Sequence, residues 1–203
     1  MNSAAVPRLI LASTSVYRRE MLARLRLPFT AIPPEVDETP QPGETPEALA
    51  MRLAQAKALA VAQQNPGCVV IGSDQVATVD GTPIGKPGSH DKAREQLRRL
   101  SGQLVEFHSA LAITDGTRIE SRDVITACQF RELSDAAIES YLLRERPYDT
   151  AGSAKAESLG IALMAEMRSD DPTAIIGLPL IALTAMLAGF GLDPLNHAAE
   201  QQA

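Results

Sequence analysis

Residues 9–25 read LILASTSVYRREMLARL, and the order of patterns in this stretch sets the class of fold. Leu9–Ala12 is a short apolar run with the length of a buried strand. Ser13–Ser15 form a hydroxyl-rich turn, after which Met21 and Leu22 lie on one face of a helical pattern. The chain therefore begins with a strand, a turn and a helix.

The same alternation of strands and helices continues along the chain. Further strands are expected at residues 29–32, 68–71, 110–114, 118–130 and 161–167, the second of them ending at Gly72-Ser73-Asp74. Further helices are expected after the cap residues Thr45, Ser89 and Ser134, and from Pro179 to Ala188. Hairpin turns are expected at Asp80-Gly81 and Asp115-Gly116. This alternation with two hairpins predicts an α/β fold with a mixed sheet.

No long or biased linker divides the 203 residues, so we expect one α/β domain over residues 1–195 and a frayed tail over 196–203. The uncharged stretch Ala174–Leu192 is interrupted by glycines and proline, which leaves a helix of about ten residues, half the thickness of a bilayer. We therefore expect a buried core helix and no membrane span.

The cysteines and the N-terminus favour a cytoplasmic protein. Cys68 and Cys128 are isolated within apolar runs, which is typical of buried free thiols in a reducing compartment. The N-terminus shows no basic segment followed by a long apolar core, so no signal peptide is expected.

The composition disfavours a nucleic-acid-binding protein. The chain contains Trp 0, Tyr 3 and Phe 4, too few rings for a platform on which bases stack. Its net charge of −6 at pH 7 also disfavours broad binding to a polyphosphate backbone. Any phosphate must meet a local cluster of cations, so the expected ligand is a small molecule.

The turn after the first strand is a candidate phosphate site. Free backbone N–H groups and the helix dipole attract anions at the start of a helix. Ser13 and Ser15 add hydrogen-bond donors, and Arg18 and Arg19 add guanidinium groups. An ordinary capped helix with solvated arginines is the alternative interpretation.

Carboxylates occur in two further candidate stretches. Glu35–Glu38 lie in a proline-rich loop, where carboxylates beside a phosphate could bind a divalent metal. Asp74 lies at the carboxyl end of a predicted buried strand, where it could act as a base or a metal ligand. The alternatives are a solvated acidic loop and a side chain that caps a turn.

Two lysines and a small-residue loop complete the candidates. Lys57 lies at the edge of an apolar helix face, and Lys86 lies in the rigid turn Gly85–Pro87, so either could reach a phosphate. Small residues in 151–157 would let the backbone approach a ligand closely, and Glu157 ends that loop. The alternatives are solvated lysines and a surface loop.

Taken in order, these stretches resemble the Maf-type nucleoside triphosphate pyrophosphatases over roughly residues 8 to 195. The matching residues are Leu11–Ser15 with Arg18-Arg19, Glu35–Glu38, Arg52–Ala54 with Lys57, Ile71–Gln75, Gly85–Pro87, Ser101-Gly102, Ala151–Ser153 and Gly177–Leu180. The resemblance implies hydrolysis of a nucleoside triphosphate to a monophosphate and pyrophosphate with a divalent cation, Mg²⁺ or Mn²⁺. It also implies an elongated mixed sheet flanked by helices, two lobes around a cleft (Maf/ITPase-like), and often a homodimer.

The resemblance also assigns roles to individual residues. It makes Asp74 the proton acceptor and Glu38 and Asp74 the candidate metal ligands. It places phosphate-binding groups at Ser13, Arg18, Arg19, Lys57 and Lys86. Which carboxylate binds the metal and which accepts the proton stays open at this point.

Three family positions are associated with the choice of base, and here they hold Tyr17, Gln75 and Glu157. This combination resembles the subfamily that acts on 7-methyl-GTP. N7-methylation makes guanine a cation, which an aromatic face binds better than a neutral base by about 0.5 to 2 kcal/mol. A carboxylate can accept hydrogen bonds from guanine N1–H and N2–H₂. Tyr17 stands where the subfamily often has tryptophan, which is the stronger partner for a cation.

Two alternatives use the same residues. One is a pyrophosphatase for other nucleotides such as dTTP or UTP, and the other is a non-hydrolysing nucleotide-binding regulator of cell division. Glu38 and Asp74 favour an enzyme, because a pure binder has little use for carboxylates beside phosphates except through a metal.

Overall fold

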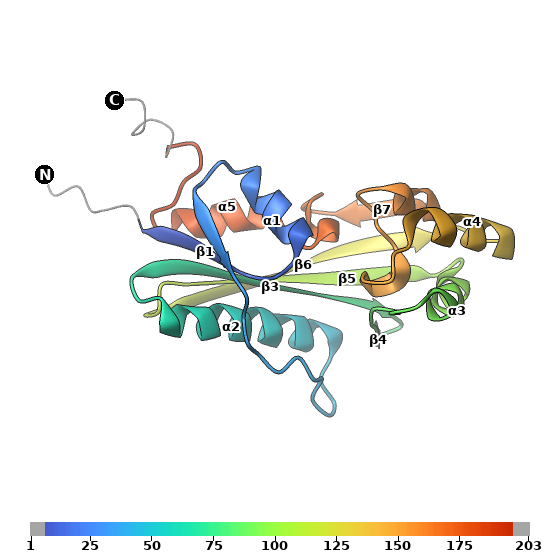
Figure 1. Cartoon of the computed structure of the whole chain (residues 1–203), viewed down its shortest axis with the longest axis horizontal. Helices are drawn as coiled ribbons and strands as arrows, with labels where there is room; N and C mark the ends of the chain where they lie inside the picture. The colour runs from blue at the N-terminus through green and yellow to red at the C-terminus, as the bar shows by residue number, and fades with distance from the viewer. Residues whose placement is uncertain (1–6, 197–203) are drawn as a thin grey trace, which may run out of the picture.

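The computed structural model describes residues 7–196, in which a seven-stranded mixed sheet is flanked by five α helices (Figure 1). The strands are β1 (Arg8–Ala12), β2 (Phe29–Ile32), β3 (Cys68–Val79), β4 (Thr82–Ile84), β5 (Leu104–Thr114), β6 (Ile119–Phe130) and β7 (Met164–Ser169). The α helices are α1 (Val16–Ala23), α2 (Pro46–Gln64), α3 (His90–Leu100), α4 (Asp135–Glu145) and α5 (Leu180–Ala188). Short 3-10 helices are η1 (Ala151–Ser153), η2 (Leu159–Leu163) and η3 (Ala174–Ile176). The expected α/β class is confirmed.

The sheet combines parallel and antiparallel pairs, as expected. Its strand order is β2-β1-β3-β5-β6-β7, and β4 also pairs with β3. β1 is parallel to β2 and β3, whereas β3, β5, β6 and β7 pair in antiparallel fashion. Both hairpins are confirmed. Asp80 and Gly81 have φ of 49° and 71°, the left-handed values that a two-residue hairpin turn requires.

The predicted end of β3 at Gly72–Asp74 is wrong, because the strand continues to Val79. Antiparallel pairing with β5 carries the ladder onward, so that Asp74 lies opposite Ala110 in mid-strand. Gly72 serves close packing and does not end the strand: a Cβ there would overlap the carbonyl oxygen of Ala54 in α2. Asp74 is therefore presented by the middle of a strand beneath a helix.

The strand expected at 161–167 begins later than predicted. Residues Leu159–Leu163 form η2, and β7 starts at Met164 opposite Phe130, the last residue of β6. Residues 161–163 lie beyond the end of the partner strand, so they lack a continuous ladder.

The expected helix starts are confirmed by their caps. Side-chain oxygens of Thr45, Ser89 and Ser134 accept hydrogen bonds from the N–H three residues further along the chain. Helix α5 follows Pro179 and packs into the core, as expected. Within residues 7–196, no helix combines the length and the apolar character needed to cross a membrane.

The two faces of the sheet carry different helices. Helix α2 packs on one face against Val76, Ala110 and Ala112. Alternate residues of β5 point to the other face, where Leu111 packs with α1 and α5 and Phe107 packs with α3 and α4. Figure 1 shows α2 on one side of the sheet and α1 and α5 on the other.

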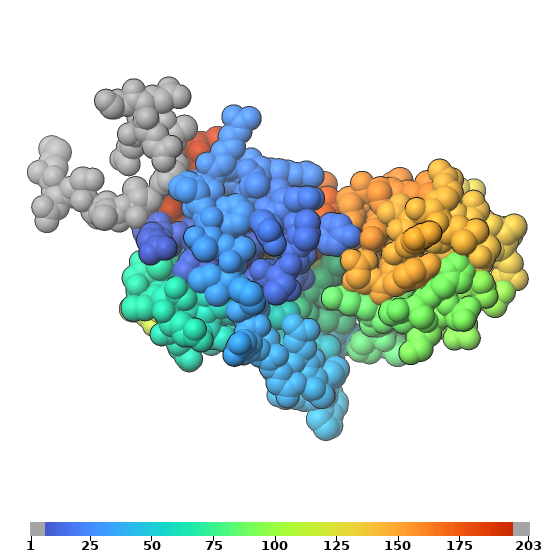
Figure 2. All heavy atoms as spheres, in the orientation of Figure 1, coloured from blue at the N-terminus to red at the C-terminus, as the bar shows by residue number. Residues whose placement is uncertain are grey.

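The molecule is elongated, with the N-terminal segments and the segments around α3 and α4 at opposite ends (Figure 2). The expected division into two lobes around a cleft stays a prediction. Cys68 and Cys128 are buried free thiols, as expected, and burial raises the pKa of Cys128 to about 12. The expected tail lies outside the described residues apart from Asn196.

Candidate active site

The centre of the site is a buried pair formed by Asp74 of β3 and Lys57 of α2. Lys57 Nζ lies 2.6 Å from Asp74 Oδ1, and the two residues are 5% and 8% exposed. Close packing of α2 at Gly72 brings the lysine down onto the strand. Burial of an unpaired charge costs several kcal/mol, so each group requires the other.

Glu38 contacts the same ammonium from the proline-rich loop. Its Oε1 lies 2.7 Å from Lys57 Nζ, while its side chain stays 61% exposed. The hydrogen bond from Lys57 is the main cause that lowers the pKa of Glu38, and the charges of Lys86 and Arg18 add to it. Two carboxylates thus share one lysine, one of them buried and the other open to solvent.

The loop that carries Glu38 is held to α2 by Arg52. Arg52 pairs with Glu44 through two hydrogen bonds of 2.6 and 2.9 Å and also donates to the carbonyl oxygen of Thr39. This contact fixes the loop on the helix that supplies Lys57.

Arg18 of α1 acts on the same carboxylates through its charge. Burial lowers the pKa of its guanidinium, while the charges of Asp74 and Glu38 oppose that shift. Arg18 Nε donates to the carbonyl oxygen of Gly177 at 3.0 Å. Ser13 supports the turn before α1, because its Oγ accepts a 3.0 Å hydrogen bond from the N–H of Ser15.

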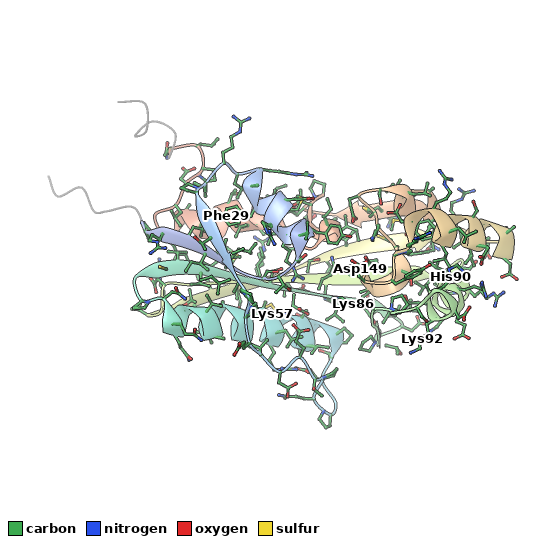
Figure 3. The ribbon with its side chains drawn as sticks, in the orientation of Figure 1. Phe29, Lys57, Lys86, His90, Lys92 and Asp149 are labelled. Carbon is green, nitrogen blue, oxygen red and sulfur yellow. The ribbon has the colours of Figure 1, made fainter. Side chains whose placement is uncertain are left out.

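The remaining predicted phosphate ligands lie at the surface. Lys86, which is labelled in Figure 3, lies in the loop between β4 and α3 and is exposed. Its charge helps to lower the pKa of Glu38. Arg19 is exposed on α1 and makes no ion pair within residues 7–196. The structure therefore brings Arg18, Lys57 and Lys86 around the carboxylates and leaves Arg19 outside this cluster.

Gln75 points to the opposite face of β3 from Asp74, since neighbouring residues of a strand alternate. Its Nε2 donates to Ser109 Oγ at 2.9 Å and to the carbonyl oxygens of Ala174 and Ile175 at 3.0 and 3.1 Å. Gln75 thus holds the segment that contains η3.

The segment between β7 and α5 contains the matching motif Gly177–Leu180, but sequence analysis assigned it no role in the site. The carbonyl oxygen of Gly177 accepts from both Arg18 Nε and Ser73 Oγ. Asp171 anchors this segment, with one oxygen bound to Thr173 and the other to the first N–H groups of α5. Backbone carbonyls carry no residue-type signal, so no sequence pattern could reveal this role.

Tyr17 and Glu157, the expected base-reading residues, are linked through Lys155. Lys155 Nζ lies 5.8 Å from the centre of the Tyr17 ring and 3.4 Å from Asp149 Oδ1. Glu157 is exposed as a residue, but burial of its carboxyl group raises its pKa while the charge of Lys155 opposes the shift. Lys155 was missed because a lysine in a small-residue loop looks solvated in sequence.

Glu38 and Asp74 can hold a divalent ion only when a substrate supplies further ligands. Within the described residues, no three His, Cys, Asp or Glu side chains gather to hold a metal. Glu38 and Asp74 already gather around one cation, the ammonium of Lys57. Mg²⁺ is commonly bound by one or two carboxylates that are completed by phosphate oxygens and water. The pair therefore suits a metal that arrives with a triphosphate.

A surface hollow elsewhere on the molecule lacks this chemistry. It lies at the β1–β2 end of the sheet and is lined by Leu9, Leu27, Phe29 and Leu192 among others. None of the predicted site residues lines it.

Comparison with known proteins shows which family the sequence matches. The profile of the family described as Maf-like protein matches residues 8–190. A 7-methyl-GTP pyrophosphatase of Bordetella pertussis is 73% identical over 193 residues, covering 95% of this chain and 97% of the relative. Relatives of the same name from Bordetella avium and Cupriavidus pinatubonensis are 74% and 58% identical, each covering 94% of this chain and 96% and 97% of the relative.

Proposed function

This chain belongs to the Maf-like family, and we propose that it hydrolyses 7-methyl-GTP to 7-methyl-GMP and pyrophosphate. The observation that carries the proposal is the pair of carboxylates, Asp74 and Glu38, that share Lys57 beside Arg18. The names of the relatives at 73% and 74% identity supply the substrate.

The cations of the site are suited to a triphosphate. Arg18 offers a planar guanidinium that can bind two phosphate oxygens, and Lys57 and Lys86 act as point charges. Ser13 keeps the turn before α1 in shape through its hydrogen bond to Ser15. Arg19, exposed at the neighbouring position, is the weakest member of this proposed set.

We assign the metal to Glu38 and Asp74. A divalent cation, Mg²⁺ or Mn²⁺, would neutralise charge on the phosphate oxygens that it contacts. Lys57 holds both carboxylates close together before substrate arrives. The carboxylate pair is thereby preorganised.

Asp74 is proposed to accept the proton of the attacking water. The water oxygen forms a bond to the α-phosphorus, the bond from this phosphorus to the bridging oxygen breaks, and pyrophosphate leaves with that electron pair. The proton moves to Asp74, whose carboxyl group is held in place by its 2.6 Å contact with Lys57 Nζ. Glu38, more exposed, is better placed to exchange ligands with solvent and metal.

The base is proposed to lie between α1 and the loop after η1. Tyr17 offers an aromatic face to the positively charged methylated base. Glu157 accepts hydrogen bonds from N1–H and N2–H₂ of guanine. Gln75 contributes through the η3 segment, to which its Nε2 is bound.

The test is pyrophosphate release from 7-methyl-GTP, GTP, dTTP and UTP with Mg²⁺ or Mn²⁺. We expect the highest kcat/KM for 7-methyl-GTP. Equal or better turnover of dTTP or UTP would contradict the substrate. Binding without turnover of any nucleotide would contradict the enzyme and favour a nucleotide-binding regulator.

The partners and the location stay predictions of the same proposal. A small nucleotide is the proposed ligand, with no nucleic acid and no membrane. A cytoplasmic location and a homodimer can be checked by cell fractionation and by sedimentation of the purified chain.

A further inference from the structure

The side chain of Lys155 lies against the ring of Tyr17, on which the base is proposed to stack. It lies in the loop between η1 and η2, whereas Tyr17 belongs to α1. Its Nζ is 5.8 Å from the centre of the Tyr17 ring, and its side chain is 14% exposed. A lysine usually keeps its ammonium in water, so a lysine side chain that is this little exposed and lies against a ring needs a physical reason.

Two contacts fix the backbone of Lys155 within its loop. Its N–H donates to the hydroxyl of Tyr141 at 3.1 Å. Gly160 packs directly on it, since a Cβ at Gly160 would come within 2.6 Å of the carbonyl carbon of Lys155. These contacts hold the backbone of Lys155 in place, and from it the side chain extends to Tyr17.

The ammonium of Lys155 is a direct neighbour of the Tyr17 ring. Its Nζ lies 5.8 Å from the ring centre, which is within the range of a cation–π contact. A base stacked on this face of Tyr17 would therefore have the ammonium beside it. Glu157, two residues further along the loop, interacts electrostatically with Lys155.

We propose that Lys155 reads the 6-oxo group of the base, its ammonium donating a hydrogen bond to O6. This inference rests on the proposed function, which places guanine on Tyr17. Lysine contact with guanine O6 is a common way of recognising this base. Lys155 then complements the acceptor O6, while Glu157 complements the donors N1–H and N2–H₂.

The charges of the loop agree with this role. Lys155 carries one positive charge, and Glu145, Asp149 and Glu157 carry negative charges around the same loop. The surroundings of Lys155 thus stay net negative, which favours a cationic methylated base beside the lysine. An adenine edge presents a donor at the 6-position, which the ammonium would meet unfavourably.

The experiment compares 7-methyl-GMP with its 6-thio analogue, which keeps N1–H and N2–H₂ but replaces O6 by a weak acceptor. Binding to the full chain is measured by titration calorimetry. Wild type is expected to prefer the 6-oxo nucleotide by about tenfold or more, the value of a charged hydrogen bond. Lys155→Gln is expected to erase that preference. Lys92→Gln removes an exposed lysine of α3 and should keep it.

Glu157→Gln supplies the second comparison, because it should weaken both nucleotides alike. If Lys155→Gln weakened the binding of both nucleotides alike, or changed the binding of neither, Lys155 would be only the ion-pair partner of Asp149. The inference would then fail, while the proposed function would stand. If wild type bound neither nucleotide, the proposed substrate and this inference would fall together.

A measurement on the unmodified chain covers the case in which Lys155→Gln does not fold. The Nζ resonance of Lys155 should shift on saturation with 7-methyl-GMP and shift much less with the 6-thio analogue. Equal shifts with both nucleotides would overturn the proposal.

Discussion

At the scale of single residues, the site depends on one buried ionic cluster. Lys57 is bound at 2.6 and 2.7 Å to Asp74 and Glu38, and Arg18 adds a second positive charge nearby. Lys57 and Asp74 form the buried part of this cluster, and removal of either leaves the other buried without its closest partner, which costs several kcal/mol. Substitutions that keep shape and change charge are therefore the most informative.

Asp74→Asn keeps the shape of the side chain but removes the proposed proton acceptor. We expect turnover of 7-methyl-GTP to fall by about 10² to 10⁴, while circular dichroism shows an intact fold. Asp80→Asn, in the exposed turn at the end of the same strand, is the matched control and should retain full activity. Near wild-type activity of Asp74→Asn would refute the assigned role.

The raised pKa of Glu157 predicts that activity on 7-methyl-GTP depends on pH. Burial raises the pKa of its carboxyl group above the ordinary value, with Glu145 and Asp149 adding to the rise and Lys155 opposing it. The ionised acceptor is present above this raised pKa and is lost as the pH falls through it. We therefore expect kcat/KM for 7-methyl-GTP to decline on the acid side.

The pKa of Glu38 is lowered, so its titration belongs to a more acidic range. In Glu157→Gln the acid-side decline should shift to lower pH, and activity on 7-methyl-GTP should fall more than activity on UTP. The pH–rate profile with both substrates checks this. An unchanged profile, or equal losses on both substrates, would show that Glu157 does not read the base.

At the scale of elements, the contact between α2 and β3 brings Lys57 to Asp74. A Cβ at Gly72 would overlap the carbonyl oxygen of Ala54 and lie 2.6 Å from the N–H nitrogen of Ala58. We expect Gly72→Ala to push α2 away and lower the free energy of unfolding by about 1 to 3 kcal/mol or more. Urea denaturation checks this. Gly85→Ala, whose Cβ would meet nothing within 4 Å, should be nearly neutral.

The segment between η3 and α5 gives a second prediction at this scale. Gly177 has φ of +104°, and a Cβ there would lie 3.6 Å from Arg18 Nε. The 3.6 Å distance is an ordinary van der Waals contact, so the positive φ decides the effect. Gly177→Ala should lose stability through backbone strain, about 1 to 3 kcal/mol. It should also lose activity, because relief of that strain shifts the carbonyl oxygen that binds Arg18 Nε.

Gly191→Ala separates the two effects, because Gly191 has φ of +76° and its Cβ would meet nothing within 4 Å. We expect it to lose comparable stability while keeping kcat and KM near those of wild type. Thermal denaturation and steady-state kinetics of both variants decide the matter. Equal losses of kcat/KM in both variants would show that the loss in Gly177→Ala does not act through Arg18.

At the scale of the whole molecule, two hydrophobic clusters share the same long strands. One packs around α1 and α5, and the other around α3 and α4, while β3, β5 and β6 run through both. Disruption of one cluster thus breaks the ladder of the other. We expect a single cooperative unfolding transition, with the same midpoint by far-ultraviolet circular dichroism and by tyrosine fluorescence. Two separated transitions would show two independent domains and contradict the single domain expected over residues 1–195.

The sequence alone determined the local structure of this protein. Apolar runs, cap residues such as Thr45 and Ser134, and the Asp-Gly turns specify elements through interactions within a few residues. For this reason the α/β class, the mixed sheet and both hairpins could be predicted. The ordered motifs also predicted the family, and they named Asp74, Lys57 and Glu38 as separate candidates.

Only the tertiary structure decided how these residues meet. The length of β3 depends on pairing with β5, and the burial of Lys57 depends on close packing of α2 at Gly72. The carbonyl oxygen of Gly177 and the ammonium of Lys155 reach their partners across 159 and 138 residues of chain, respectively. Contacts of this kind arise from packing between distant segments and leave no local periodicity, so they could be found only once the chain was folded.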